Sequence, residues 1–171
     1  MKFKDWFDSK LKVGAFPYKQ DTNFIAGLYD VVINVSDEFY FDIEQQLQDA
    51  GCKTYWFPMN EQKRDIGVNS IYGAMVILQE AEKHNKSVYL HCHAGLNRSP
   101  TVWAAYYFMR TGKDAEWSRG SFVNRLAANC TRGYLPPQAE MKSFLGKVAS
   151  LTKSMQGGIL DEAKIGTINN F

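Results

Sequence analysis

The sequence predicts one α/β domain with a largely parallel central sheet flanked by helices. Three observations support this fold class. The chain has 171 residues, 45% of them hydrophobic, which suits one domain with a substantial core. Short apolar runs typical of buried strands alternate with longer stretches of helical periodicity. No repeat and no low-complexity linker divides the chain.

Strands are expected at 31–35, 53–57 and 87–91, which are short apolar runs bounded by turn residues. A helix is expected over 39–50, closed by Gly51. Residues 58–68 are polar and without periodicity, so they are expected to form a loop. Asn69 or Ser70 is expected to cap the next helix, whose apolar residues recur at spacings of three and four: Ile71, Ala74, Met75, Leu78 and Ala81.

The remaining expected helices cover 99–110, 114–128 and 136 or 137 to 151. Trp6 and Phe7 are expected to hold the N-terminal segment against the domain. Residues 153–171 carry no strong pattern. The chain is therefore divided into a domain over 1–152 and a tail or docking segment over 153–171.

Composition excludes several classes of function. Twenty Lys and Arg against eighteen Asp and Glu give a net charge of +2, so nucleic-acid binding through bulk charge is not expected. The longest apolar run, 102–109, is far shorter than the roughly 20 residues that span a bilayer, so no membrane insertion is expected. The N-terminus lacks an apolar signal region, and the chain has three cysteines. Both features favour a reducing, cytoplasmic location.

The segment HCHAGLNRS, residues 91–99, carries the chemistry. Cys92 follows a predicted buried strand, and a short glycine-bearing turn leads into a helix. Backbone N–H groups of such a turn and the positive end of the helix dipole together bind a phosphate dianion. The same field stabilises a thiolate and favours Cys92 as a nucleophile.

The neighbouring residues have matching roles. Arg98 can bind two phosphate oxygens with its planar guanidinium, and Ser99 can donate a hydrogen bond to the sulfur. His91 is expected to orient the turn, and His93 to line the pocket rim or face solvent. No metal is expected, because two histidines beside one cysteine lack a fourth ligand and the usual zinc spacing. The turn itself is expected to contact the phosphate through Ala94, Gly95, Leu96 and Asn97.

HCHAGLNRS resembles the HCxxGxxR[ST] signature loop of the cysteine-dependent protein tyrosine phosphatase superfamily, and more narrowly of its dual-specificity branch. VVINVSDE, residues 31–38, is similar to the strand before the second helix of those domains. The resemblance extends over about 21–145. It implies a two-step reaction without metal or cofactor, in which Cys92 forms a phosphocysteine that water then hydrolyses.

The resemblance also implies a general acid, usually Asp, on a loop that follows a strand. Glu61 lies 31 residues before Cys92, and Asp65 lies 27 before it. Dual-specificity domains most often show the longer spacing. Glu61 is therefore the first candidate and Asp65 the second, with the absence of a dedicated acid as a third possibility.

The function expected is hydrolysis of phosphomonoesters, above all protein phosphotyrosine with phosphoserine or phosphothreonine, and inhibition by phosphate-like oxyanions. Leu96 and Asn97 are neutral where phosphoinositide phosphatases often have Lys, which weakens a lipid substrate. Two alternatives stay open. An RNA 5′-triphosphatase is suggested by the GLNR sequence at 95–98, and a weakly catalytic phosphate-binding module by the absence of Asp at the usual spacing.

Overall fold

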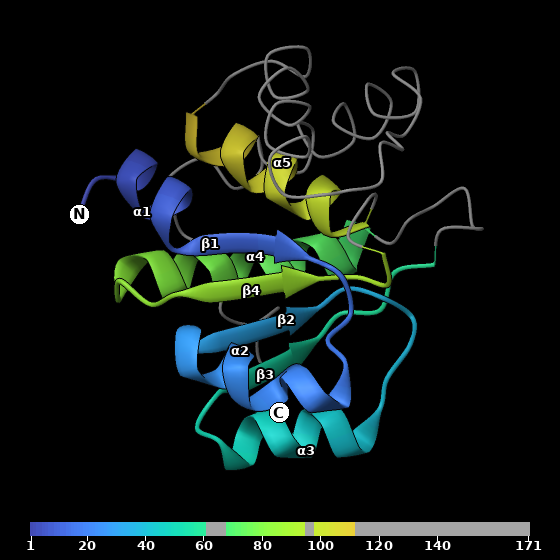
Figure 1. Ribbon diagram of the computed structural model, residues 1–171. Coiled ribbons are helices and arrows are strands. Elements are labelled where there is room, and N and C mark those ends of the chain that lie inside the picture. The colour runs from blue at the N-terminus through green and yellow to red at the C-terminus, as the bar shows by residue number, and fades with distance from the viewer. Residues whose placement is uncertain (61–67, 95–97, 112–171) are drawn as a thin grey trace.

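The computed structural model describes residues 1–60, 68–94 and 98–111 (Figure 1). All of its strands are short, and each is followed by a loop that leads into a helix or a helical turn. The strands are β1 (Leu11–Gly14), β2 (Val31–Asn34), β3 (Lys53–Trp56) and β4 (Val88–His91). The helices are α1 (Phe3–Ser9), η1 (Lys19–Asp21, a 3-10 turn), α2 (Thr22–Leu28), α3 (Phe41–Asp49), α4 (Val68–Lys83) and α5 (Arg98–Thr111).

The sheet has the strand order β1-β4-β2-β3, and every pair of neighbours is parallel. The register aligns the last residues of all four strands: Gly14 and Asn34 both lie opposite His91, and Asn34 lies opposite Trp56. The predicted α/β class with a parallel sheet is confirmed. Because the strands end together, the loops that follow them meet at one edge.

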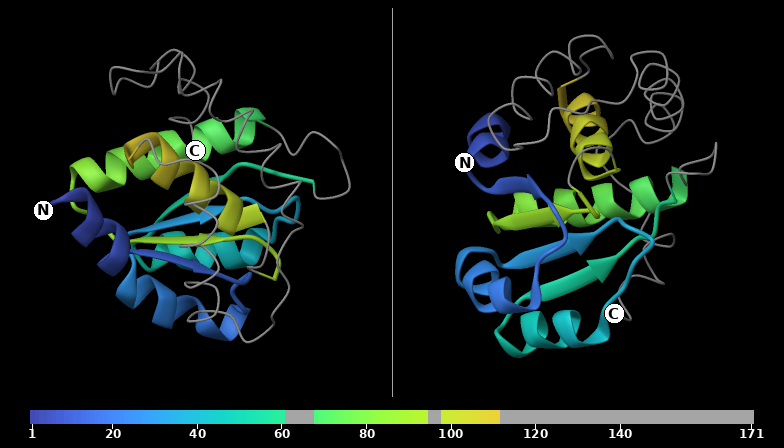
Figure 2. Two further views of the ribbon diagram at one scale, coloured as in Figure 1. Left: turned by 90° about the horizontal axis from the view of Figure 1, so that it is seen from above. Right: turned by 45° about the vertical axis from the view of Figure 1, so that its right-hand side comes forward.

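Helices cover both faces of the sheet (Figure 2). One face packs against α1, α4 and α5, and its core includes Ile33 and Leu90 of the central strands. The other packs against α2 and α3, where Val32 contacts a smaller cluster that contains Cys52. Alternate residues of β2 therefore supply two separate cores, as the period of two along a strand requires.

The N-terminal segment is part of the larger core. Trp6 and Phe7 are almost fully buried, which confirms the expected clamp. Phe7 packs against Trp103 of α5 with ring centroids 4.9 Å apart. The Trp6 indole also donates a 2.8 Å hydrogen bond to the carbonyl oxygen of Lys86. Since Arg98 is the first residue of α5, α1 supports the helix that carries this arginine.

Gly51 ends α3 as the sequence indicates. Its φ is +101°, in the region that favours glycine. Gly51 N–H bonds the carbonyl of Gln48, and Cys52 N–H bonds that of Leu47. This is the two-bond closure of a Schellman motif, and it satisfies carbonyls that the helix leaves without partners.

One expected cap is wrong. Asn69 and Ser70 lie inside α4, which includes Val68. The Ser70 hydroxyl donates instead to the carbonyl of Pro58, 2.7 Å away. The serine thus joins the end of the β3 segment to α4. The expected helices over 114–128 and 136–151, the tail 153–171 and the boundary at 152 lie outside the described residues.

Candidate functional site

The candidate site lies where the strands end, at the right of the sheet in Figure 1. Cys92 follows β4, which is one of the two central strands. The segment after β1 joins this loop through Phe16 N–H, which donates a 2.8 Å hydrogen bond to the carbonyl of His93. The segment after β2 joins it through Val35 N–H, bonded to the carbonyl of His91. Backbone hydrogen bonds therefore fix the cysteine loop from both sides.

Cys92 is buried, and its sulfur has a donor within reach. The Ser99 hydroxyl lies 3.3 Å from Cys92 Sγ, and Ser99 is itself fully buried. Ser99 is the second residue of α5, so the sulfur lies close to the N-terminus of a 14-residue helix. A hydroxyl donor and a helix N-terminus therefore lie at the sulfur of the predicted nucleophile.

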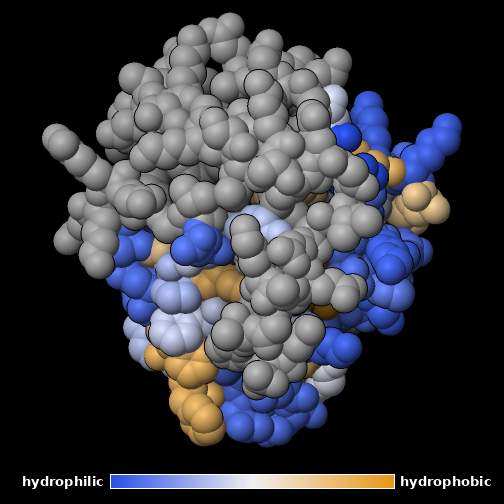
Figure 3. All heavy atoms as spheres, turned by 180° about the vertical axis from the view of Figure 1, so that it is seen from behind, coloured by the Kyte–Doolittle hydropathy of each residue, from blue (hydrophilic) through white to orange (hydrophobic). Residues whose placement is uncertain are grey.

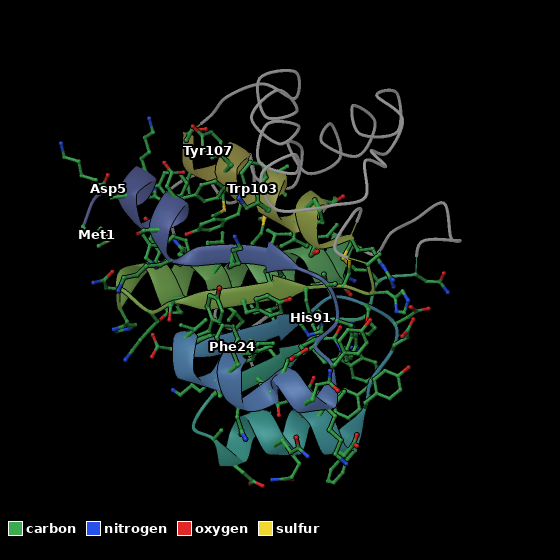
Figure 4. The ribbon with its side chains drawn as sticks, in the orientation of Figure 1. Met1, Asp5, Phe24, His91, Trp103 and Tyr107 are labelled. Atoms are coloured by element: carbon green, nitrogen blue, oxygen red, sulfur yellow. The ribbon has the colours of Figure 1, made fainter. Side chains whose placement is uncertain are left out.

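His91 lies under the loop, fully buried (Figure 4). Its Nδ1 donates to the carbonyl of Cys92 at 3.1 Å. The ring of Phe16 packs edge-on against it, with centroids 4.6 Å apart. Burial lowers the pKa of His91 to about 4, although the bond to Cys92 acts in the opposite direction. The imidazole is therefore neutral near pH 7 and orients the loop without adding charge.

Arg98 is buried at the start of α5 and connects three loops. Its Nη1 donates to Asp37 Oδ1 at 2.7 Å and to the carbonyl of Met59 at 2.9 Å. Asp37 follows β2, and Met59 precedes the segment that carries the candidate acids. The hydrogen bond from Arg98 holds the pKa of Asp37 below its usual range. Asp37 is thus an ionised partner for the guanidinium and is unsuited to donating a proton near neutral pH.

A buried polar cluster fixes the backbone on both sides of Asp37. Asn34 Oδ1 accepts hydrogen bonds from the Ser36 backbone N–H at 2.9 Å and from its hydroxyl at 2.7 Å. Asn34 Nδ2 donates to the carbonyl of Glu38 at 2.8 Å. The Trp56 indole donates to the carbonyl of Ser36, also at 2.8 Å. The position of Asp37 is set by these bonds and does not depend on Arg98 alone.

The side chain of His93 is mostly exposed, which fits the expectation that it lines a pocket rim or faces solvent. Its Nδ1 is 3.1 Å from Glu38 Oε2, and the Tyr40 hydroxyl is 3.4 Å from the same oxygen. Consecutive acidic residues therefore contact both ends of the signature segment, Asp37 at Arg98 and Glu38 at His93.

The structure brings together the predicted residues His91, Cys92, His93, Arg98 and Ser99. Ala94 is half-buried in the same turn. Glu61, Asp65, Gly95, Leu96 and Asn97 lie outside the described residues. Within 1–60, 68–94 and 98–111, no group of His, Cys, Asp and Glu could hold a metal ion. Over the same ranges, no helix is long and apolar enough to cross a membrane.

Two contacts escaped sequence reasoning. The sequence pattern places Asp37 and Glu38 only at the end of a strand motif, yet both contact the signature segment. A signal was present: a parallel sheet brings the residues after β2 next to those after the neighbouring β4. An acidic pair just after β2 can therefore contact basic residues in the segment that follows β4.

A family described as "Dual specificity phosphatase, catalytic domain" matches residues 19–125, more than half of the chain. The chain belongs to this family. The dual-specificity phosphatase match includes every residue of the signature segment, and with the fold it makes the chain a phosphatase of the cysteine-dependent type. None of the curated proteins matches significantly in sequence.

Solved structures share the dual-specificity phosphatase fold at low sequence identity. Tk-PTP in its active form matches with a TM-score of 0.70 and 18% identity, over 84% of this chain and 94% of that one. PTPMT1 in complex with PI(5)P matches with a TM-score of 0.67 and 18% identity, over 85% and 96%. TpbA of P. aeruginosa matches with a TM-score of 0.62 and 18% identity, over 85% and 86%.

Proposed function

We propose that this dual-specificity phosphatase hydrolyses phosphorylated proteins, phosphotyrosine first, through a phosphocysteine intermediate. The observation that carries the proposal is the placement of Cys92 with Ser99 Oγ 3.3 Å from its sulfur and Arg98 at the start of the next helix. This arrangement offers a nucleophile, a donor to that nucleophile and a cation for the phosphoryl oxygens.

In the first step, the Cys92 thiolate attacks phosphorus and an S–P bond forms. The bond between phosphorus and the leaving oxygen breaks, and that oxygen takes a proton from the general acid. Charge on the equatorial oxygens is stabilised by Arg98 and by backbone N–H groups of the signature turn. We assign the acid to Glu61, with Asp65 as the alternative. Asp37 is not a candidate, because Arg98 keeps it ionised.

In the second step, water attacks phosphorus while the same carboxylate accepts its proton. The S–P bond breaks, and inorganic phosphate and the thiolate are released. The Ser99 hydroxyl stabilises the departing thiolate through the hydrogen bond that it donates to Sγ. Ser99 is therefore expected to matter more for breakdown of the intermediate than for its formation.

A phosphoinositide is the second candidate substrate. One observation favours it: PTPMT1, a structural relative of this chain, was solved in complex with PI(5)P. A phosphotyrosine peptide and a phosphoinositide in vesicles, compared at equal phosphate concentration, separate the two substrates.

The mechanism is tested by hydrolysis of p-nitrophenyl phosphate in the presence of chelator and reductant. Cys92→Ser is expected to abolish turnover and the phosphorylated-enzyme mass seen on acid quench. Cys52→Ser is the matched control, because Cys52 is also buried but lies on the other face of the sheet. Full turnover by Cys92→Ser would exclude the covalent mechanism. An inactive wild type that still binds vanadate would favour the phosphate-binding module.

The same assay assigns the acid. Glu61→Gln is expected to remove the fall in rate toward alkaline pH, and Asp65→Asn to leave it in place. The opposite result would move the role to Asp65.

A further inference from the structure

An exposed aromatic surface lies beside the signature loop. Four exposed aromatic side chains lie on the segments that follow β1 and β2, with Tyr18 and Phe41 each 72% exposed. Figure 3 shows an apolar area at its lower left, on the side toward which the strands run. The members of this surface are Tyr18, Phe39, Tyr40 and Phe41.

Ring contacts connect this surface to the signature loop. Phe16 packs edge-on against Tyr40, with centroids 5.2 Å apart, and against His91 on its other side. Tyr40 thus lies two ring contacts from His91, the residue that precedes Cys92. An extended polypeptide advances about 3.3 Å per residue. With a phosphorylated side chain at Cys92, the residues two or three positions away along the peptide therefore reach Tyr40.

The two segments that carry the surface are held together. Lys19 Nζ lies 3.2 Å from Asp42 Oδ2, which joins η1 to the start of α3. Tyr18 and Phe41 each immediately precede one member of this ion pair. The ring of Phe39 packs against the ring of Trp56, with centroids 4.8 Å apart. The surface is therefore built on fixed elements, although its rings remain open to solvent.

The charge around the surface indicates which partner it fits. Residues 15–21 and 35–42 contain four carboxylates. Asp42 pairs with Lys19 and Asp37 with Arg98, so the acidic excess comes from Asp21 and Glu38. Such a surface repels anionic lipid headgroups and polyanions. It is complementary to a polypeptide that carries apolar and basic side chains.

Resting on the proposed phosphatase function, we propose that Tyr18, Phe39, Tyr40 and Phe41 form the docking surface for the polypeptide next to the phosphorylated residue. The preferred substrate is a phosphotyrosine segment with apolar and basic neighbours. Apolar neighbours bury against the rings, and basic neighbours face Asp21 and Glu38, the carboxylates that no Lys or Arg pairs with in the interactions described above. Acidic neighbours lower kcat/KM.

The test compares two phosphotyrosine peptides, one flanked by Leu and Arg and one by Glu, with p-nitrophenyl phosphate. The double variant Tyr18→Ser/Phe41→Ser is expected to lose about tenfold in kcat/KM for the Leu/Arg peptide and nothing for the aryl phosphate. Leu28→Ser is the control. Leu28 is also exposed, but it lies at the opposite edge of the sheet, where its carbonyl accepts from Ser87.

The proposal is overturned if the double variant processes both peptides as the wild type does. It is also overturned if the wild type prefers the Glu peptide, or if only turnover of a phosphoinositide in phosphatidylcholine vesicles falls. Calorimetric binding of the Leu/Arg peptide to Cys92→Ser, with and without the double substitution, gives a readout independent of turnover. Weaker binding in the double variant supports the docking surface even if the proposed chemistry fails, and unchanged binding refutes it.

Discussion

Arg98 Nη1 donates a 2.7 Å hydrogen bond to Asp37 Oδ1, joining residues that are 61 positions apart in the sequence. The guanidinium is buried, whereas the Asp37 side chain is 47% exposed. The aspartate therefore supplies the countercharge without closing the site. A guanidinium already held by Asp37 and Met59 would lose less conformational freedom in the phosphoryl binding proposed for Arg98.

Asp37→Asn is expected to lower kcat/KM for p-nitrophenyl phosphate about tenfold, because an amide holds the Arg98 fork less firmly than a carboxylate. The inhibition constant of phosphate should rise in parallel. Asp42→Asn is the control, since Asp42 is exposed and pairs with Lys19 instead. Equal losses in both variants would show that the charge of the whole loop matters more than the contact with Arg98.

Arg98→Lys tests the geometry of the cation. Lysine keeps the charge but cannot reproduce the planar guanidinium, whose Nη1 donates to both Asp37 and Met59 and which is proposed to bind the phosphoryl group. Turnover is expected to fall by about a hundredfold or more, with the fold retained by circular dichroism. Arg110→Lys is the control. Arg110 lies on the same helix and pairs with Glu82, so this substitution should change stability more than rate. Near-normal kcat in Arg98→Lys would contradict the assigned role.

Glu44 gives a prediction about pH and stability. It is buried in α3, and burial raises its pKa to about 7 against a hydrogen bond with Thr54 that lowers it. The pKa of Glu44 is higher in the folded state than in the unfolded state, where it is about 4.5. Protonation of Glu44 therefore stabilises the folded protein fully below pH 4.5, and this stabilisation is lost as pH rises to about 7.

Glu44→Gln removes this titration. Relative to wild type, the variant is expected to gain about 2–3 kcal/mol in unfolding free energy between acidic pH and pH above 7. Urea denaturation at both pH values measures the difference. Glu80→Gln is the control, because Glu80 is exposed and pairs with His84. A constant difference between wild type and Glu44→Gln at all pH values would mean that folding does not shift the pKa of Glu44.

The part of the fold that the sequence predicted is the part with strong local signals. β2 is buried at all four positions, so its continuous apolar run was easy to recognise. Gly51 predicted the end of α3, because a residue in the left-handed region is needed there. The sequence pattern does not predict β1, because Leu11–Gly14 has one buried residue and gains its strand conformation by pairing with β4. That pairing is tertiary, and no local pattern reports it.

The residues of the candidate site fall into the same two groups, those that a local pattern indicates and those that only the tertiary structure brings together. Cys92, Arg98 and Ser99 lie on one strand-turn-helix unit, so their spacing alone indicates their proximity. Asp37 reaches Arg98 only because β2 lies beside β4 in the sheet. Strand order is set by packing across the whole domain, so this contact could not be read from a motif.

Gly14 is the last residue of β1 and lies against Tyr89 of the neighbouring strand β4. A Cβ at this position would overlap the hydroxyl and ring of Tyr89 on the neighbouring strand. The Tyr89 hydroxyl donates a 2.7 Å hydrogen bond to the carbonyl of Ala15, so the ring cannot move without losing this bond. Gly14→Ala is therefore expected to destabilise the protein by about 2 kcal/mol, measured by thermal or urea unfolding.

The effect should also reach the site, because Phe16 packs on His91 and bonds the carbonyl of His93. A fall in kcat/KM should accompany the loss of stability in Gly14→Ala. Gly27→Ala is the matched control: Gly27 lies in α2 with open space where a Cβ would stand, so alanine there should stabilise the helix by up to about 1 kcal/mol. If both alanines changed stability alike, the fit between β1 and Tyr89 would not be what fixes this end of the strand.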